Sequence, residues 1–256
     1  MMLLMLWRHS MKTLGILSRK GGVGKTTIAI HLAVLAHEAG LRALLIDLDP
    51  QRSATQWWRA RAAEAPHLVE TDTTQLRGIL EDAAADGVDL TVIDTRPSQE
   101  TDVERVAVLA DLTLVPTRPS IFDLRAILGT LDTAKGVARR SMIVLNACPP
   151  PRGAGEAAVT VDARKALTAF GVPVAPTSIV NRSIFPAAAV DGLTAGEVDP
   201  GGKGAREMRA LWLTLMKELM DGKGRVAARA GAEKSRAGGR TTADTTGGRV
   251  KATAKG

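Results

Sequence analysis

The stretch "LSRKGGVGKTTIAI", residues 17–30, decides the fold because it has the features of a phosphate-binding loop. The common form of such a loop is G-x-x-x-x-G-K-[ST]. The GKT at 24–26 matches its end, but Arg19 stands where the first glycine is expected. An additional lysine, Lys20, precedes the next two glycines. The loop therefore carries two lysines, and Lys20, which the common pattern lacks, needs its own explanation.

Each residue type in this loop fits phosphate chemistry. Glycines allow backbone N–H groups to turn inward around phosphate oxygens, and the helix that begins near Lys25 adds the positive end of its dipole. Lys25 is expected to neutralise the β- and γ-phosphates, and Thr26 to offer a hydroxyl to Mg²⁺. The predicted nucleotide-binding residues of the loop are Gly21, Gly22, Val23, Gly24, Lys25, Thr26 and Thr27.

Short apolar runs alternate with segments of helical spacing along the chain. This alternation predicts an α/β fold, with a doubly wound, mostly parallel sheet flanked by helices and ligands at the carboxyl ends of the strands. The expected strands are 13–17, 42–49, 89–94, 112–116, 141–147 and 172–180. The expected helices are 27–39, 54–63, 74–85, 100–110, 124–137, 162–170 and 205–220.

Carboxylates follow two of the expected strands. Asp47 and Asp49 lie two residues apart at the end of one apolar run, so strand periodicity places them on the same side. Asp94 ends another run, where an acidic residue can hold a Mg²⁺-bound water. A single strand-end Asp can also be only a turn former, but the group beside a phosphate loop favours metal and water handling.

Together, "KGGVGKTT", "DLDPQ", "SATQWW" and the strand-end Asp94 resemble the ParA/MinD family of deviant Walker A ATPases. Order and spacing match from residue 11 to about 220. The short form without an N-terminal DNA-binding domain fits best, and "TSIVNRSIFPAAAVDGLTAGEV" is similar to the small plasmid-partition, ParF-like type. The resemblance implies a Mg²⁺-dependent ATPase of weak intrinsic activity, with ATP and Mg²⁺ as cofactors.

The resemblance also explains the second lysine. It implies that ATP is sandwiched in a homodimer and that Lys20 reaches the phosphates bound by the other subunit, as an arginine finger does. It assigns Asp49 to the attacking water, Asp47 to the support of the metal shell, and Asp94 to Mg²⁺. Asn146 takes the place of an adenine-recognising Asn, although a turn-forming Asn before three prolines is an equal alternative. The implied catalytic residues are Lys20, Lys25 and Asp49; the implied metal site is Thr26, Asp47 and Asp94.

Two positions depart from the family pattern. Relatives commonly have D-T-P-P or D-x-P-G after the Asp94 strand, whereas this chain has an arginine at 96. Arg118, in "VPTRPS", stands in a loop expected near the dimer interface. Neither change removes a catalytic group, but both bear on the conformation of the loops around the phosphates.

For function, the resemblance favours a DNA-partition ATPase that binds non-specific DNA through Arg182, Lys203, Arg206 and Arg209 and positions plasmid, chromosome or other cargo. No sequence-reading module is visible, so a ParB-like or cargo-adaptor partner would choose the target. The alternatives are a MinD-like membrane-associated ATPase, or a ParA-like ATPase that positions a protein assembly or conjugation machinery. A nitrogenase-iron-protein relative would need bridging cysteines, and Cys148 is the single cysteine.

Composition separates the body of the chain from its ends. Residues 222–256 hold nine Lys or Arg against two acidic residues, which accounts for the whole formal charge of +7. Their lack of large apolar residues predicts a basic disordered tail. Residues 1–10 are expected to be a non-native or unstructured extension, and residues 11–221 the ATPase domain. Without a secretory signal, disulfide framework or membrane span, we expect a cytoplasmic, nucleoid-associated protein with no membrane partner.

Overall fold

The predicted doubly wound α/β fold is confirmed. The computed structural model describes residues 10–97, 100–137, 140–151, 153 and 155–237. One six-stranded sheet has the order β3-β2-β4-β1-β5-β6, and every neighbouring pair is parallel. Its strands are β1 (Lys12–Ile16), β2 (Ala43–Asp47), β3 (His67–Glu70), β4 (Leu90–Asp94), β5 (Leu112–Thr117) and β6 (Ser141–Leu145).

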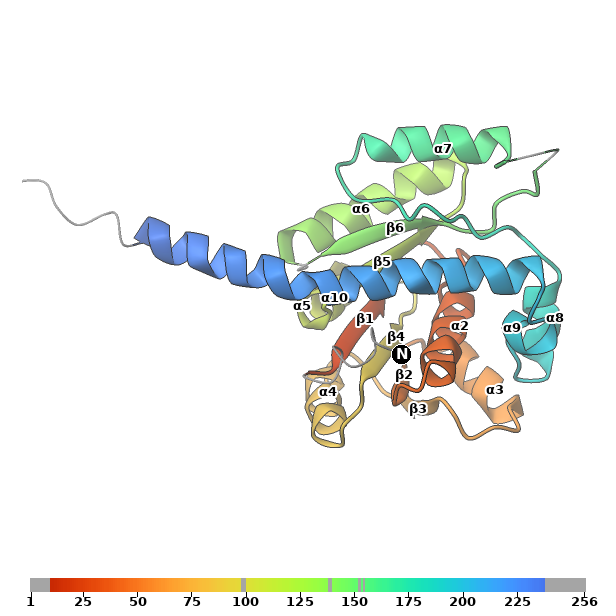
Figure 1. Cartoon of the computed structure of the whole chain (residues 1–256), viewed down its shortest axis with the longest axis horizontal. Helices are drawn as coiled ribbons and strands as arrows, with labels where there is room; N and C mark the ends of the chain where they lie inside the picture. Colours follow the sequence, from red (N-terminus) through yellow and green to blue (C-terminus); the bar gives the residue numbers. More distant parts are fainter. Residues whose placement is uncertain (1–9, 98–99, 138–139, 152, 154, 238–256) are drawn as a thin grey trace, which may run out of the picture. The chain divides into compact units, whose positions relative to one another are not determined.

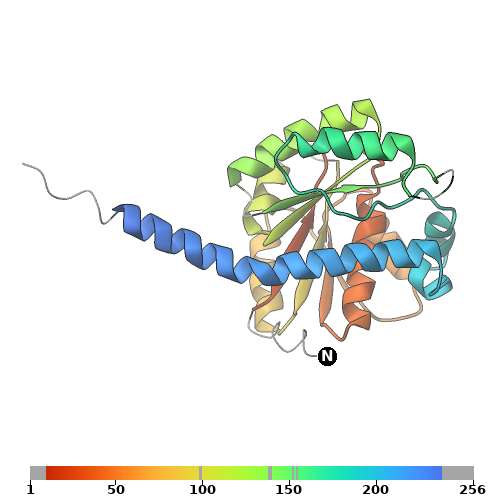
Figure 2. The ribbon, with the colours of Figure 1, turned by 45° about the horizontal axis from the view of Figure 1, so that its top comes forward.

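Helices connect the parallel strands and cover both faces of the sheet (Figures 1 and 2). They are α2 (Lys25–Glu38), α3 (Ser53–Ala60), α4 (Leu76–Ala85), α5 (Glu100–Leu109), α6 (Ile121–Val137), α7 (Ala158–Thr168), α8 (Ile184–Val190), α9 (Ala195–Val198) and α10 (Lys203–Ala237). Among the residues that the structure describes, no helix is long and apolar enough to cross a membrane.

Side chains that alternate along each strand enter different hydrophobic clusters. Leu14, Leu45 and Val92 pack with residues of α2 and α10, whereas Ile46 and Ile93 pack with residues of α4 and α5. A third cluster joins β5 and β6 to α6 and α7. Both faces of the sheet are therefore covered, and this explains why the strands read as continuous apolar runs.

Two expectations about the strands were wrong. Residues 172–180 form only isolated bridges, Ile143 with Val174 and Cys148 with Val180, because Pro173 and Pro176 have no N–H to donate to a ladder. The sheet contains instead β3, which is a short, partly exposed edge strand and so has no continuous apolar run. Helices α8 and α9 were also not predicted.

The chain divides into a first compact unit that ends at Met220 and a second that begins at Asp221. Helix α10 continues through residues 222–237, where composition predicts disorder, so the structure differs from that expectation over this range. The remaining tail, 238–256, and residues 1–9 of the expected N-terminal extension lie outside the described residues.

Candidate functional site

The phosphate-binding loop connects β1 to α2. Gly22 and Gly24 have φ values of 70° and 86°, in the left-handed region that glycine adopts without steric cost. Gly24 is the N-cap of α2, and no side chain caps this helix end. The N–H groups of the first turn therefore have no side-chain acceptor, at the place where the sequence predicts phosphate binding.

Lys25, Thr26 and Asp94 lie together at the start of α2 and the end of β4. The Thr26 hydroxyl donates to Asp94 Oδ2 at 2.7 Å. Burial lowers the pKa of Lys25, while the charges of Asp94 and Asp49 oppose that shift. Burial also raises the pKa of Asp94 to about 7, with Asp47 and Asp49 adding to the shift and Thr26 and Lys25 opposing it. The site thus holds a strongly desolvated cation next to a strongly desolvated acid.

The second oxygen of Asp94 supports the metal prediction. Asp94 is fully buried, and its Oδ1 has no hydrogen-bond partner. Such an atom normally has a ligand or water as its partner. With the Thr26 hydroxyl it offers the hard oxygen chemistry that Mg²⁺ prefers. Among the described residues no group of three His, Cys, Asp or Glu could hold a metal.

Asp47 and Asp49 differ in their surroundings. Asp47 pairs in register with Asp94 across β2 and β4 and is fully buried. Its carboxylate accepts from the Asp49 N–H at 3.0 Å and from the Thr55 N–H and hydroxyl at 3.0 and 2.9 Å. Asp49 is only partly buried. The contacts of Asp47 therefore fix the turn that carries Asp49 and the start of α3.

Lys20 lies against its own chain. Its Nζ is 2.7 Å from Asp123 Oδ1 in the first turn of α6. Burial alone would raise the pKa of Asp123, but hydrogen bonds from Lys20 and Ser120 outweigh it and lower this pKa. The sequence prediction did not include Asp123. Its signal is the Ser-x-x-Asp pattern at 120–123, since the Asp123 N–H donates to Ser120 Oγ as in a helix cap.

Two side chains that directly follow β5 and β6 reach the same loop. Arg118 donates from Nη2 to the Gly22 carbonyl, and Asn146 donates from Nδ2 to the Val23 carbonyl at 2.6 Å. Both residues line a cavity of about 220 Å³ with Gly22, Gly24 and Thr27. Asn146 is thus beside the predicted nucleotide site, but its amide group contacts the loop itself.

A buried histidine connects α2 to α9, and no sequence pattern indicated it. His31 Nδ1 donates to the Thr27 carbonyl at 2.7 Å, so Nε2 is free to accept from the Ala195 N–H at 3.0 Å. Burial lowers the pKa of His31 to about 4, so the ring is neutral near pH 7. Thr27 belongs to the predicted nucleotide loop, and the connection therefore joins this loop to the chain before α10.

Arg96 has a defined partner. Its guanidinium donates to Asp102 Oδ2 of α5 from Nε at 3.0 Å and from Nη2 at 2.5 Å. Asp102 also accepts from the Thr73 hydroxyl at 3.0 Å. The departure from the family pattern after Asp94 thus ties the loop that follows β4 to the beginning of α5.

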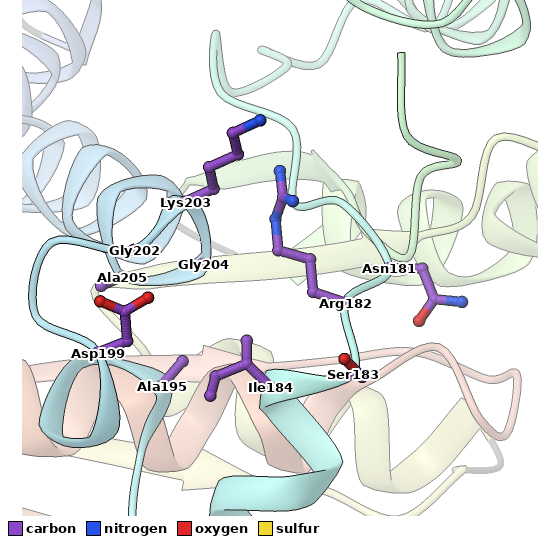
Figure 3. Close-up of a pocket in the computed structure, with 10 residues that line it drawn as sticks. All are labelled: Asn181, Arg182, Ser183, Ile184, Ala195, Asp199, Gly202, Lys203, Gly204 and Ala205. Atoms are coloured by element: carbon purple, nitrogen blue, oxygen red, sulfur yellow. The ribbon is translucent and has the colours of Figure 1, made fainter. Parts of the chain in front are cut away.

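The four predicted DNA-binding residues differ in their surroundings. Arg182 and Lys203 line one pocket of about 430 Å³ at the start of α10 (Figure 3). Arg182 pairs with Glu207 at 2.6 Å, and this hydrogen bond raises its pKa. Arg209 donates to the Pro200 carbonyl at 2.6 Å. Lys203 and Arg206 are exposed. The charge of Arg182 is therefore largely balanced, and Lys203 and Arg206 contribute most to a positive surface.

Proteins of known name are similar to this chain over most of its length. Maintenance of carboxysome distribution protein A of Gloeobacter kilaueensis is 34% identical over 209 residues, covering 81% of this chain and 94% of the relative. The protein of that name in Halothiobacillus neapolitanus is 28% identical, covering 76% and 91%. The structure of a variant of Cyanothece McdA in complex with ATP has a TM-score of 0.65 at 18% identity and covers 84% and 97%. At this identity the structural likeness shows the fold.

The family comparison covers most of the first unit. The model of the CobQ/CobB/MinD/ParA nucleotide binding domain matches residues 14–195. This range contains the phosphate-binding loop, the three carboxylates and Asn146. The chain therefore belongs to the ParA/MinD family of nucleotide-binding proteins, and the resemblance seen in the sequence is confirmed.

Proposed function

We propose that the protein is a Mg²⁺-dependent ATPase that forms an ATP-sandwich homodimer and positions a cargo on DNA. The observation that carries this proposal is the group of Lys25, Thr26 and Asp94, in which Lys25 and Asp94 are buried and one Asp94 oxygen has no hydrogen-bond partner. The N–H groups of the loop and Lys25 would hold the phosphates, while Thr26 and Asp94 would hold Mg²⁺. Bound Mg²⁺ would neutralise charge on the phosphates.

Hydrolysis needs a positioned water and a stabilised transition state. Asp49 is the residue that we propose for the water, because Asp47 fixes its turn and its charge acts on both Lys25 and Asp94. Lys20 is the residue that we propose for the other subunit's phosphates. Its side chain is 37% exposed, so it can exchange Asp123 for a phosphate oxygen when a second subunit arrives.

For the DNA surface, the exposed Lys203 and Arg206 near the start of α10 are the strongest candidates. Arg182 and Arg209 would support this surface, since both already have partners in the chain. Binding through phosphates requires only exposed positive charge and is independent of sequence. A partner protein would then supply the choice of target.

For the cargo, the relatives that align with this chain over most of their own length favour a protein assembly over a plasmid. Two proteins named for the maintenance of carboxysome distribution align with this chain over 94% and 91% of their own lengths. We therefore propose a large protein assembly as the cargo, reached through an adaptor protein. Partition of a plasmid or chromosome is the second candidate, through the likeness to the small partition ATPases.

The test compares four proteins in ATP binding and phosphate release. Lys25→Ala should abolish ATP binding, because it removes the main counter-charge of the phosphates. Lys20→Ala should keep ATP affinity within about threefold of the wild type and lose hydrolysis, because its partner phosphates belong to the other subunit. Lys165→Ala, at an exposed position of α7, is the control for the loss of one charge and should match the wild type. Equal loss of ATP affinity in Lys20→Ala and Lys25→Ala would contradict the sandwich dimer.

A further inference from the structure

Two side chains from neighbouring strands hold consecutive carbonyl groups of the phosphate-binding loop. Arg118 follows β5 and donates to Gly22, while Asn146 follows β6 and donates to Val23. We infer that this pair, here called the loop clamp, positions the loop for polyphosphate before any nucleotide binds. The inference rests on the proposed function, because it requires that the loop binds phosphates.

Peptide geometry gives the reason. In a planar trans peptide the carbonyl of one residue and the N–H of the next point in opposite directions. A carbonyl of Gly22 held toward Arg118 therefore directs the Val23 N–H away from that side chain. A carbonyl of Val23 held toward Asn146 does the same for the Gly24 N–H. The clamp thus sets two N–H groups in the orientation that a phosphate cradle needs.

The two parts of the clamp have a common, rigid base. The Asn146 N–H donates to the Thr117 carbonyl at 2.8 Å, directly before Arg118. Thr117 and Leu145 are register partners at the ends of β5 and β6. Ala147, directly after Asn146, has a φ of 50°, a conformation that few non-glycine residues adopt. The pairing of the strand ends therefore fixes the backbone from which both side chains extend.

Close packing confines the Asn146 side chain to this contact. A Cβ added at Gly24 would overlap Asn146 Nδ2, so only glycine leaves room for the amide. Asn146 is 7% exposed, and its amide hydrogen bond to Val23 is buried. A residue that only recognised a base would not need this approach to the loop backbone. The structure therefore assigns Asn146 a positioning role for the phosphates.

The test separates phosphate positioning from base recognition by using a ligand without a base. Binding of ATP and of inorganic tripolyphosphate, each with Mg²⁺, is measured by calorimetry on the full chain. Arg118→Ala and Asn146→Ala should each weaken both ligands about tenfold, the size of one lost hydrogen bond to a polar group. The double variant should lose less than the product of the two effects, because both side chains order the same loop.

Two further variants serve as controls. Arg125→Ala, on the exposed side of α6, removes one arginine outside the cavity and should bind like the wild type. Arg118→Lys keeps one donor and should recover part of the affinity that Arg118→Ala loses. If Asn146→Ala does not fold, the two variants at the exposed Arg118 still decide the outcome for that half of the clamp.

Three results would overturn the inference or its basis. Wild-type affinity of Arg118→Ala for tripolyphosphate would remove Arg118 from the clamp. Weaker ATP binding by Asn146→Ala with unchanged tripolyphosphate binding would show that Asn146 recognises adenine. A wild-type protein that binds neither ligand would instead overturn the proposed function, so the two failures can be told apart.

Discussion

At the scale of single residues, two anionic groups compete for the Lys20 side chain. It pairs with Asp123 in the single chain, yet the proposed reaction needs it at the phosphates of a second subunit. A pair between a half-exposed lysine and a nearly buried carboxylate contributes up to about 1 kcal/mol. The pair is therefore weak enough to be exchanged on dimer formation, and strong enough to lower the fraction of Lys20 that is available.

We predict that Asp123→Asn raises the rate of ATP hydrolysis by roughly two- to fivefold, the factor that a pair of this strength represents. The reason is that Lys20 loses its competing anion. Phosphate release at saturating ATP is the measurement, and Asp132→Asn on the exposed side of the same helix is the matched control. A rate at or below that of the wild type would mean that Asp123 does not restrain Lys20.

Sequence reasoning placed in one site the residues whose signal lies in their neighbours in the chain, and the structure brings them together, while their roles stay predictions. Lys25 and Thr26 follow from the loop pattern, and Asp94 from its place after an apolar strand. The contacts of Asp123, Arg118 and His31 join residues up to 164 positions apart, and no local pattern contains them. For Arg118 the sequence indicated an unusual residue, but its hydrogen bond to Gly22 depends on how β5 lies beside β1.

At the scale of elements, a polar network ties α2 to α3 and α9. His31 of α2 accepts from the Ala195 N–H at the start of α9. In the same segment, Glu197 pairs with Arg61 at 2.6 Å and forms a capping box with Thr194. Trp57 of α3 donates to the Leu193 carbonyl at 3.1 Å. Hydrogen bonds therefore connect α2, which begins at the nucleotide loop, with the residues that precede the proposed DNA surface.

We predict that His31 makes the protein less stable in mild acid. Its pKa is about 4 in the fold and 6.5 when unfolded, so between these values the unfolded chain binds more protons. Its contribution is complete above pH 6.5 and is lost as the pH falls toward 4. Between roughly pH 7.5 and pH 5 the free energy of unfolding should fall by about 2 kcal/mol from this group.

Urea unfolding at the two pH values, with wild type and His31→Gln, is the measurement. Gln is unable to gain a proton in this range, so the variant should lack this part of the pH dependence. Exposed histidines such as His37 and His67 are common to both proteins and cancel in the comparison. The same pH dependence in both proteins would show that His31 is not held neutral by burial.

The elements that the sequence predicted well are those with a continuous apolar run or a long segment of helical periodicity. Strands β1, β2, β4, β5 and β6 all overlap the expected ranges, because burial on both faces requires continuous apolar residues. β3 was missed because it is a short edge strand with exposed positions. Residues 172–180 are apolar, but they pair with β6 and the residues after it only at isolated bridges. Their prolines lack the N–H groups that a continuous strand ladder would need.

At the scale of the whole molecule, charge is distributed unevenly along the sequence. Residues 222–256 account for the formal charge of +7, so the rest of the chain is neutral overall. A neutral body with a local group of exposed basic residues would bind DNA weakly by itself, and a basic tail would bind regardless of nucleotide. A switch that depends on ATP needs a surface that only the dimer completes.

We predict that the tail contributes to DNA binding but is not sufficient for it. Deleting residues 222–256 should keep ATP-dependent retention on non-specific DNA and give a shallower dependence of affinity on salt, because fewer counterions are released. The measurement is a DNA titration at several salt concentrations, with ATP and with ADP, for the full chain and the truncated chain. A double variant with Lys203→Ala and Arg206→Ala removes positive charge from the first unit instead of the tail. It should reduce DNA binding mainly in the presence of ATP. Equal salt slopes for the two chains would remove the tail from the interaction, whereas loss of all nucleotide dependence on truncation would show that the dimer surface does not bind DNA by itself.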